Sequence, residues 1–154
     1  MQKLLVSTIV ISLTTGIPIV ALADPYDDFM KTQVSEFESV GSDKCKEQKR
    51  TVMERSNKVT YDLCLLQGKP IFLRASNDGT PFSVSNYKKG KLVQLSTWEG
   101  TGGVGFLNGK PVVEWNSGEF SQRRVNWKLT AEEKSKYLEI AAKEKRILLK
   151  FGIR

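Results

Sequence analysis

Short runs of alternating hydrophobic and polar residues fill the middle of the chain. Apolar side chains occupy every second position in residues 58–67, and residues 70–76, 82–87 and 91–98 repeat the pattern. Glycine, asparagine, aspartate or proline separates the runs at intervals of about eight to twelve residues, as in Asn77-Asp78-Gly79. Successive side chains of a strand point to opposite faces of the sheet, so this alternation indicates strands with one buried and one exposed face. The pattern predicts an antiparallel β-meander of about six to eight short strands.

Helical patterns flank this β-rich region. Residues 25–40 carry apolar side chains at loosely helical spacing and predict a short N-terminal helix. The polar residues 41–49 then predict a loop that carries Cys45.

The C-terminal segment predicts a long helix from about Ala131 to Lys150. Thr130 and Glu133 have the spacing of a capping box, and Gly152 is placed to end the helix. An apolar stripe at helical spacing is expected to pack on one face of the sheet; it consists of Tyr137, Ile140, Ala141, Ile147, Leu148 and Phe151.

A glycine-rich stretch from Trp98 to Trp115 contains the spacing G-x-G-x-x-G, at Gly100, Gly102 and Gly105. A dinucleotide-binding loop needs a helix directly after these glycines to hold the pyrophosphate. Here Asn108-Gly109 follows instead, which is a strong signal for a two-residue hairpin turn. We therefore interpret the stretch as a β-hairpin and expect no nucleotide and no other cofactor.

The hairpin about Asn108-Gly109 predicts a register. Phe106 should face Pro111, and Gly102 should face Trp115, so that the indole ring covers bare backbone.

The first 23 residues have the layout of a secretory signal peptide. Lys3 precedes the uncharged, mostly apolar run Leu4–Val20, and Ala21-Leu22-Ala23 forms a small-x-small cleavage site. The alternative is a retained membrane anchor, although Gly16 and Pro18 interrupt the apolar run. We expect cleavage, with residues 24–154 forming a single globular α+β domain that is periplasmic or secreted.

Cysteine and histidine content limits the chemistry. An exported chain with two cysteines, Cys45 and Cys64, predicts a disulfide, with two free thiols as the alternative. Histidine is absent, which excludes Ser-His-Asp and Cys-His nucleophile systems within this chain. Two cysteines without histidine also cannot supply a four-ligand structural zinc site.

Charge is distributed unevenly around a net value of +7. Residues 24–43 hold six acidic and one basic side chain, whereas residues 44–154 hold 22 basic and 11 acidic ones. A basic body favours anionic partners, such as an envelope polymer, membrane head groups or an acidic protein. Export argues against nucleic acid.

Aromatic and basic side chains near turns are the candidate binding residues. An exposed tryptophan beside basic residues combines a large contact area with charge. The binding residues proposed on this basis are Trp98, Lys88, Lys89, Arg123 and Arg124.

Carboxylates offer a different chemistry. Glu99, Glu114 and Glu119 include candidates for a glycosidase-type pair, although a strand residue such as Glu114 is expected to face water. A rigid turn, Asn77-Asp78-Gly79 or Gly100–Gly103, would instead suit an inhibitor that blocks a secreted enzyme.

The sequence as a whole predicts an exported, non-catalytic binding domain for a protein or an anionic envelope component. The alternatives are an inhibitor of a secreted enzyme and a hydrolase that uses paired carboxylates. As a small exported β-rich domain with a disulfide, the chain superficially resembles bacterial lysozyme inhibitors, but no motif of theirs is matched residue by residue, and no site is carried over.

Overall fold

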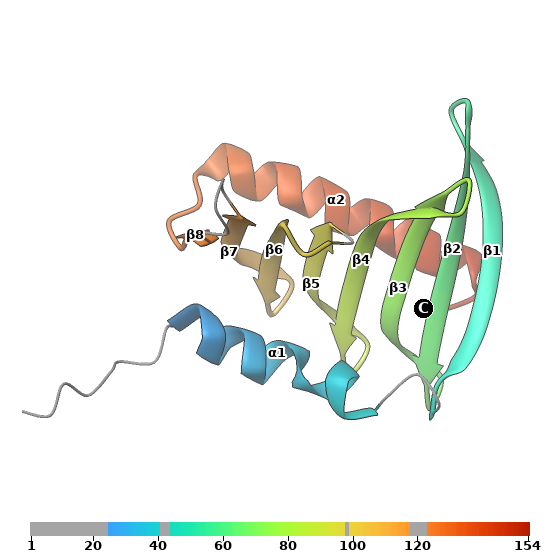
Figure 1. The fold of residues 1–154 in the computed structure, drawn as a ribbon, viewed down its shortest axis with the longest axis horizontal. Helices are drawn as coiled ribbons and strands as arrows, with labels where there is room; N and C mark the ends of the chain where they lie inside the picture. The colour runs from blue at the N-terminus through green and yellow to red at the C-terminus, as the bar shows by residue number, and fades with distance from the viewer. Residues whose placement is uncertain (1–24, 41–43, 98, 118–122) are drawn as a thin grey trace, which may run out of the picture.

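A computed structural model of the chain describes residues 25–40, 44–97, 99–117 and 123–154. The described residues form an eight-stranded antiparallel sheet in which each strand pairs with the next one along the chain. One helix precedes the sheet and another follows it (Figure 1). This architecture confirms the predicted α+β meander with a helix at each end. The predicted signal peptide lies outside the described residues.

The elements are mostly short, and their order is that of the chain. They are α1 (Pro25–Val40), β1 (Lys46–Glu54), β2 (Asn57–Leu66), β3 (Lys69–Asn77), β4 (Thr80–Lys88), β5 (Lys91–Thr97), β6 (Gly102–Leu107), β7 (Lys110–Ser117), β8 (Arg123–Asn126) and α2 (Ala131–Lys150).

Tight turns join many of the neighbouring strands. In Gln67-Gly68, Asp78-Gly79, Lys89-Gly90 and Asn108-Gly109, both residues have positive φ. A type I′ hairpin turn requires this conformation, and its twist matches that of the flanking strands. The glycines in the sequence therefore mark most of the places where the meander reverses.

Strand β1 is the element that the sequence pattern missed. Residues 41–49 were expected to form a polar loop, but 46–49 belong to β1, which pairs with β2 along its whole length. Residues 41–43 lie outside the described part of the chain. As the outermost strand, β1 buries little on either side, and most of its side chains are exposed. Its residues therefore lack the alternation that identifies a half-buried strand.

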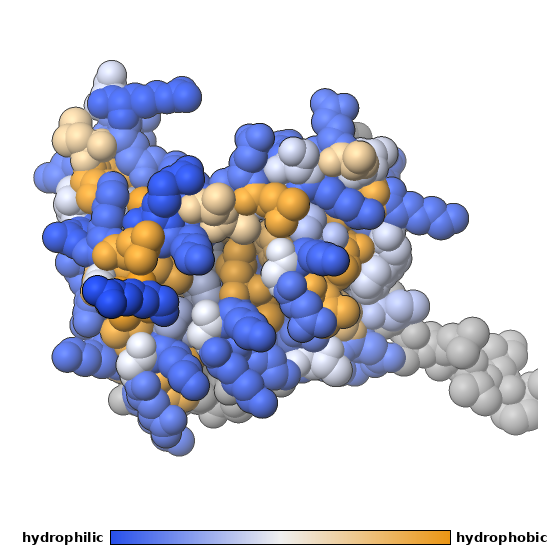
Figure 2. Space-filling model, turned by 180° about the vertical axis from the view of Figure 1, so that it is seen from behind, coloured by the Kyte–Doolittle hydropathy of each residue, from blue (hydrophilic) through white to orange (hydrophobic). Residues whose placement is uncertain are grey.

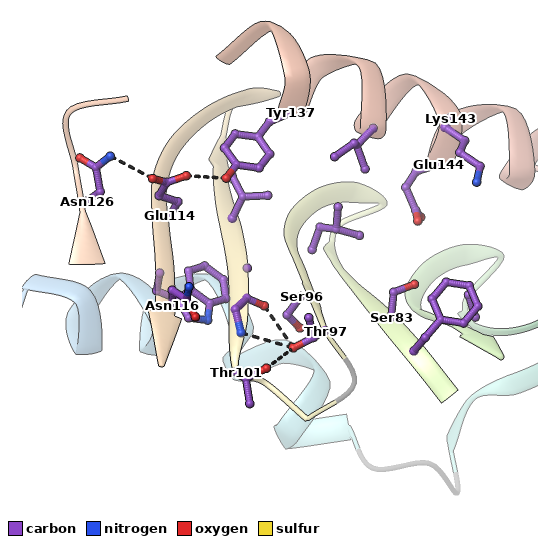
Figure 3. A pocket seen from close by; sticks show the side chains of 18 of the residues that line it. Ser83, Ser96, Thr97, Thr101, Glu114, Asn116, Asn126, Tyr137, Lys143 and Glu144 are labelled. Atoms are coloured by element: carbon purple, nitrogen blue, oxygen red, sulfur yellow. Dashed lines mark hydrogen bonds between the residues drawn. The ribbon is translucent and has the colours of Figure 1, made fainter. Parts of the chain in front are cut away.

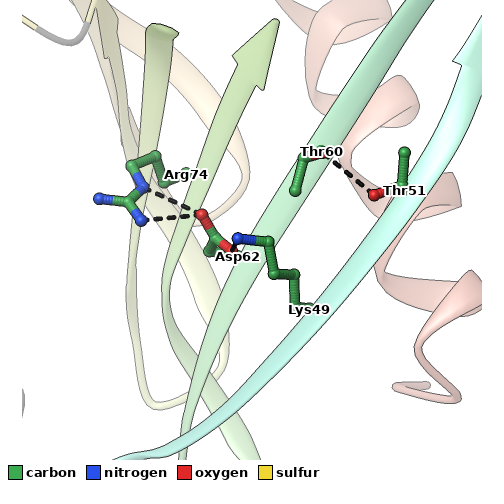
Figure 4. A network of polar contacts seen from close by, with 5 residues as sticks. All are labelled: Lys49, Thr51, Thr60, Asp62 and Arg74. Carbon is green, nitrogen blue, oxygen red and sulfur yellow. Dashed lines mark hydrogen bonds and ion pairs between the residues drawn. The ribbon is translucent and has the colours of Figure 1, made fainter. Parts of the chain in front are cut away.

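Polar cross-strand contacts link β1 to β2 and β2 to β3 on one face of the sheet (Figure 4). The Arg74 guanidinium donates to Oδ2 of Asp62 from Nη2 at 2.8 Å and from Nε at 3.2 Å, and Lys49 Nζ lies 3.4 Å from Oδ1. The hydroxyls of Thr51 and Thr60 are 3.0 Å apart. Such cross-strand pairs contribute roughly 0.2–1 kcal/mol each.

The predicted disulfide joins Cys45, just before β1, to Cys64 in β2. A cross-link between positions 19 apart stabilises the fold by about 3 kcal/mol, because it restricts the unfolded chain. A disulfide indicates an oxidising, extracytoplasmic environment. Among the described helices, none combines the length and apolar character needed to cross a bilayer.

The two helices cover opposite faces of the sheet. Successive residues of a strand point to opposite sides. In β7, Val113 and Trp115 pack with Tyr26 of α1, whereas Glu114 between them accepts a hydrogen bond from Tyr137 of α2. Figure 1 shows α1 in front of the strands and α2 crossing behind them. The result is a helix–sheet–helix arrangement of three layers.

The larger core lies between the sheet and the C-terminal half of α2. Ile147 and Leu148 are buried there, as the predicted stripe requires. Full burial of one such side chain stabilises the fold by about 1.5–3 kcal/mol. The sheet contributes alternate residues of β2 and a few residues of β3 and β4 to this core. They are Val59, Tyr61, Leu63, Leu65, Leu73, Ala75 and Tyr87.

Both ends of α2 are capped as predicted. The Thr130 hydroxyl accepts from the Glu133 backbone N–H at 3.2 Å, and the Glu133 carboxylate accepts from the Thr130 N–H at 2.7 Å. At the other end, Gly152 has φ +79° and its N–H donates to the Leu149 carbonyl. The Ile153 N–H donates to the Leu148 carbonyl, which completes a Schellman motif.

The glycine-rich hairpin has the predicted turn but a shifted register. Phe106 faces Pro111 as expected, and the register then changes, so that Trp115 faces Gly103 rather than Gly102. Pro111 has no N–H to continue the ladder, and a bulge at this position absorbs one extra residue of β7.

Gly103 and Gly105 make room for aromatic rings rather than for a phosphate. A Cβ on Gly103 would lie 2.3 Å from Cζ2 of Trp115, and one on Gly105 would lie 2.4 Å from Cε1 of Phe29. The Trp115 ring in turn packs edge-on against Tyr26, with centroids 5.3 Å apart. The next element is strand β7 and not the helix that a dinucleotide loop needs.

We predict that Gly103→Ala lowers the free energy of unfolding by about 3 kcal/mol, because overpacking forces neighbouring atoms to move. Besides the Trp115 ring, the new methyl group would meet the Leu95 carbonyl oxygen at 2.6 Å, and backbone cannot easily give way. The matched control is Gly102→Ala, whose methyl group has its nearest neighbour at 3.5 Å. Urea unfolding of both variants measures the difference, and equal losses would contradict this packing.

Candidate functional site

A pocket of about 770 Å³ lies between α2 and the sheet. Its apolar wall includes Leu95 and Val104 from the sheet and Ile140 from the helix. The close-up in Figure 3 shows side chains from β4 to β8 and from α2 around this space. Pockets of about 300–1,000 Å³ with apolar walls and a few polar groups are typical small-molecule sites.

The pocket lies along the middle of α2, around Ile140. Ile147 and Leu148 pack into the core, and Tyr137 reaches β7 through its hydroxyl. Between these contacts, the helix presents Ile140, and the sheet opposite includes small residues such as Ser83 and Gly102. Small side chains on the sheet therefore leave a gap that the helix does not fill.

Hydroxyl and amide groups provide the polar part of the lining. The Thr97 hydroxyl lies 3.0 Å from that of Thr101 and accepts from the Gly102 N–H at 3.3 Å. These contacts fix the hydroxyls in place without a charge. The other neutral polar residues of the lining are Ser83, Ser96, Asn116 and Asn126.

Glu144 is a carboxyl group inside the apolar stripe of α2. The Tyr87 hydroxyl donates to its Oε2 at 2.9 Å. Burial raises the pKa of Glu144 above its ordinary value, although hydrogen bonds from Tyr87 and Ser85 act in the opposite direction. We did not single out Glu144 from the sequence. The sequence does contain a signal for this residue. Glu144 lies four positions after Ile140 and three before Ile147, which places an acidic side chain on the same helix face as the apolar stripe.

A second carboxylate, Glu54 of β1, is bound by two residues of the pocket lining, Tyr61 and Lys143. Lys143 Nζ lies 2.7 Å from its Oε2, and the Tyr61 hydroxyl donates to its other oxygen. Burial raises the pKa of Glu54, but the hydrogen bonds from Lys143 and Tyr61 outweigh burial and leave the pKa lowered. Glu54 therefore remains ionised and ties β1 to α2.

Glu114 forms the contact at the opposite end of the pocket. Its carboxylate accepts from Nδ2 of Asn126 at 3.0 Å and from the Tyr137 hydroxyl. Burial and the contact with Glu114 raise the pKa of Tyr137 to about 12, so this phenol stays protonated and continues to donate. The expectation that Glu114 faces water is wrong, because α2 covers this side of β7.

Of the candidate carboxylates that the structure describes, Glu114 lines the pocket and Glu99 does not. Glu99 is exposed in the turn after β5, and Glu119 lies outside the described residues. Figure 3 shows Glu114 and Glu144 near α2 at separate positions, each directed toward its own surroundings rather than toward the other. Within the part of the chain that the structure describes, no three acidic or cysteine side chains cluster as metal ligands would.

The predicted binding residues lie at opposite ends of the strands. Strands β4 and β8 run in the same direction. Lys88 and Lys89 are at the end of β4, whereas Arg124 is near the start of β8. Arg124 lines the pocket. Trp98 and the Arg123 side chain lie outside the described part of the structure.

The remaining two tryptophans occupy different environments. Trp115 is buried against α1, whereas Trp127 is 42% exposed and packs edge-on against Phe29 at 5.9 Å. On the face that carries α2, apolar side chains reach the surface between charged ones (Figure 2).

Comparison with known protein families, curated proteins and solved structures finds no match for this chain. The site is therefore interpreted from its own geometry.

We predict that Glu144→Gln stabilises the protein increasingly as the pH rises. The folded-state pKa of Glu144 lies above the unfolded value of 4.5, so the wild-type chain loses stability as the pH rises through the window between these two values. Glutamine keeps an oxygen for Tyr87 but cannot ionise. The difference in free energy of unfolding should therefore widen as the pH rises above the unfolded value of 4.5.

The matched control is Glu139→Gln, on the exposed side of the same helix. Urea unfolding at several pH values measures both variants. A pH dependence that is the same for the two substitutions would show that burial of Glu144 does not affect its ionisation.

Proposed function

We propose that this protein is an exported, non-catalytic binding domain whose pocket beneath α2 holds the apolar part of an anionic envelope amphiphile. The observation that carries this proposal is the pocket itself: about 770 Å³ in volume, with Leu95, Val104 and Ile140 in its wall and neutral hydroxyl and amide groups beside them. Such walls favour a ligand that is apolar over most of its length.

Charge favours an anionic end on this ligand. The chain has a net charge of +7, which raises the local concentration of anions near its surface. Arg124 is in the lining and faces Asn116 across the β7–β8 pair, where a carboxylate or phosphate would find a cation and a neutral amide donor. Lys143 is less suited to this role, because it is bound to Glu54.

Binding without catalysis agrees with the state of the carboxylates. Glu114 is engaged by Asn126 and Tyr137, and Glu144 by Tyr87. A glycosidase needs two carboxyl groups facing one bond, about 5–9 Å apart. In this pocket each group instead serves to attach α2 to the sheet.

The disulfide supports export, since it is stable in an oxidising compartment. Export also brings the chain into contact with envelope lipids and their fragments. A protein partner that inserts an apolar side chain into the pocket is the alternative occupant, and an enzyme inhibited in this way would be one such partner.

The experiment is a fluorescence titration of the mature chain with dansyl-labelled undecanoic acid. We predict saturable binding to the wild-type protein that Ile140→Asp weakens at least about tenfold, a loss of about 1.4 kcal/mol. The new carboxylate would lie in the apolar wall and repel the anionic probe. Ile140→Trp, which fills the space without adding charge, should weaken binding in the same direction.

The matched control is Leu138→Asp, two residues away on the same helix, where the side chain is 46% exposed. It adds the same charge outside the pocket and should leave the affinity within about twofold. Thermal unfolding of each variant separates loss of binding from loss of folding. Equal weakening by Leu138→Asp and Ile140→Asp, or no saturable binding to the wild type, would overturn the proposal.

A further inference from the structure

A second pocket, of about 450 Å³, lies at the ends of the strands that are far from Arg124. It is formed where the β2–β3 turn, the β4–β5 turn, the C-terminal half of α2 and the last residues of the chain meet. Part of its floor is apolar, made of Pro70, Leu92, Leu148 and Ile153.

Basic side chains from four separate segments surround this floor. Lys69 follows the β2–β3 turn, Lys89 is in the β4–β5 turn, Lys145 is on α2, and Arg154 is the last residue. All four are exposed. We call this arrangement the basic pocket. Cations drawn together from distant parts of the chain repel one another, so the folded protein carries a concentrated positive field at this place.

One acidic residue, Glu144, also contributes to the basic pocket. Its carboxyl group accepts a hydrogen bond from Tyr87, which lies on the sheet beneath it. Burial raises the pKa of this carboxyl group. The four basic side chains outnumber it, so the basic pocket keeps a net positive charge even when Glu144 is ionised.

The backbone holds these side chains in a defined arrangement. Both turns have positive φ at their two central residues, as in rigid type I′ hairpins. The Lys69 side chain lies against Gly90 of the neighbouring turn, 3.7 Å from where a Cβ would be. The Ile153 N–H donates to the Leu148 carbonyl at 3.1 Å and fixes the C-terminal residues beside the helix.

We propose that the basic pocket binds a phosphate ester, with the phosphate between the basic side chains and a short apolar chain on the floor. Lysine and arginine side chains both bind phosphate: the lysine ammonium group acts as a point charge, and the planar arginine guanidinium group can donate two parallel hydrogen bonds. The apolar floor distinguishes an ester with a hydrocarbon group from the free ion. Glu144 is the residue that lines both this site and the pocket beneath α2. The inference does not depend on the function proposed for that pocket.

The test is an NMR titration of the ¹⁵N-labelled mature chain with hexyl phosphate and, separately, with inorganic phosphate. We expect hexyl phosphate to shift the amide signals of Lys89, Gly90 and Ile153 in a saturable manner. Inorganic phosphate should bind the same residues at least about tenfold more weakly, because it leaves the floor uncovered. Equal affinity for both would overturn the assignment of an ester and leave a site for a free anion.

A matched pair of double variants tests the charge. Lys69→Glu with Lys145→Glu should weaken hexyl phosphate binding at least about tenfold. Lys128→Glu with Lys134→Glu makes the same change in net charge on exposed residues away from the basic pocket, and should have less than about a twofold effect. Equal losses in both double variants would show that only overall charge matters, and would refute the site.

Ile140→Asp separates this inference from the proposed function. Ile140→Asp should weaken binding of the dansyl-labelled fatty acid but not of hexyl phosphate. Lys69→Glu with Lys145→Glu should weaken binding of hexyl phosphate but not of the fatty acid. Loss of both ligands in either variant, with folding intact by thermal unfolding, would contradict two independent sites.

Discussion

Hydrogen bonds between tyrosine and glutamate determine how α2 lies on the sheet. Tyr137 of α2 donates to Glu114 of β7, and Tyr87 of β4 donates to Glu144 of α2. A typical intramolecular hydrogen bond contributes about 0.5–1.5 kcal/mol to stability, and one to a charged group contributes about 1.5–3 kcal/mol. Tyr137 and Glu144 stand on either side of Ile140 along α2, and Ile140 lines the pocket between these two contacts.

The same arrangement explains why the protein can place apolar and polar groups side by side. The C-terminal half of α2 contributes Ile147 and Leu148 to a well-packed core, which anchors the helix. The N-terminal half contributes Ile140 to a wall that faces space rather than another side chain. On the other side of the sheet, aromatic rings pack between α1 and the strands. Gly103 and Gly105 have no side chain and leave room for these rings. The face that carries α2 therefore holds both the larger core and the pocket, whereas aromatic side chains pack on the face that carries α1.

Local signals were sufficient to predict most of the fold. The capping box at Thr130, the glycine turns and the alternation in β2 and β3 each act over a few residues, and each is present as predicted. Strand β1 was missed because an exposed edge strand has no buried face to impose a pattern. The register beyond Phe106 was missed because a bulge moves every later residue by one position. The pocket could not be predicted at all, since Leu95, Glu114 and Ile140 meet only through tertiary packing. Of the proposed binding residues, Arg124 reaches this pocket and Lys89 reaches the basic pocket, a division that depends on strand direction.

The central claim is that the space beneath α2 receives the apolar part of a ligand. The most direct measurement is an NMR titration of the ¹⁵N-labelled mature chain with unlabelled undecanoic acid, kept below its micellar concentration. The account predicts saturable shifts for Leu95, Val104 and Ile140, and unchanged signals for the outer strand β1. Shifts confined to the exposed side of α2, or no saturable shift at the pocket residues, would contradict it.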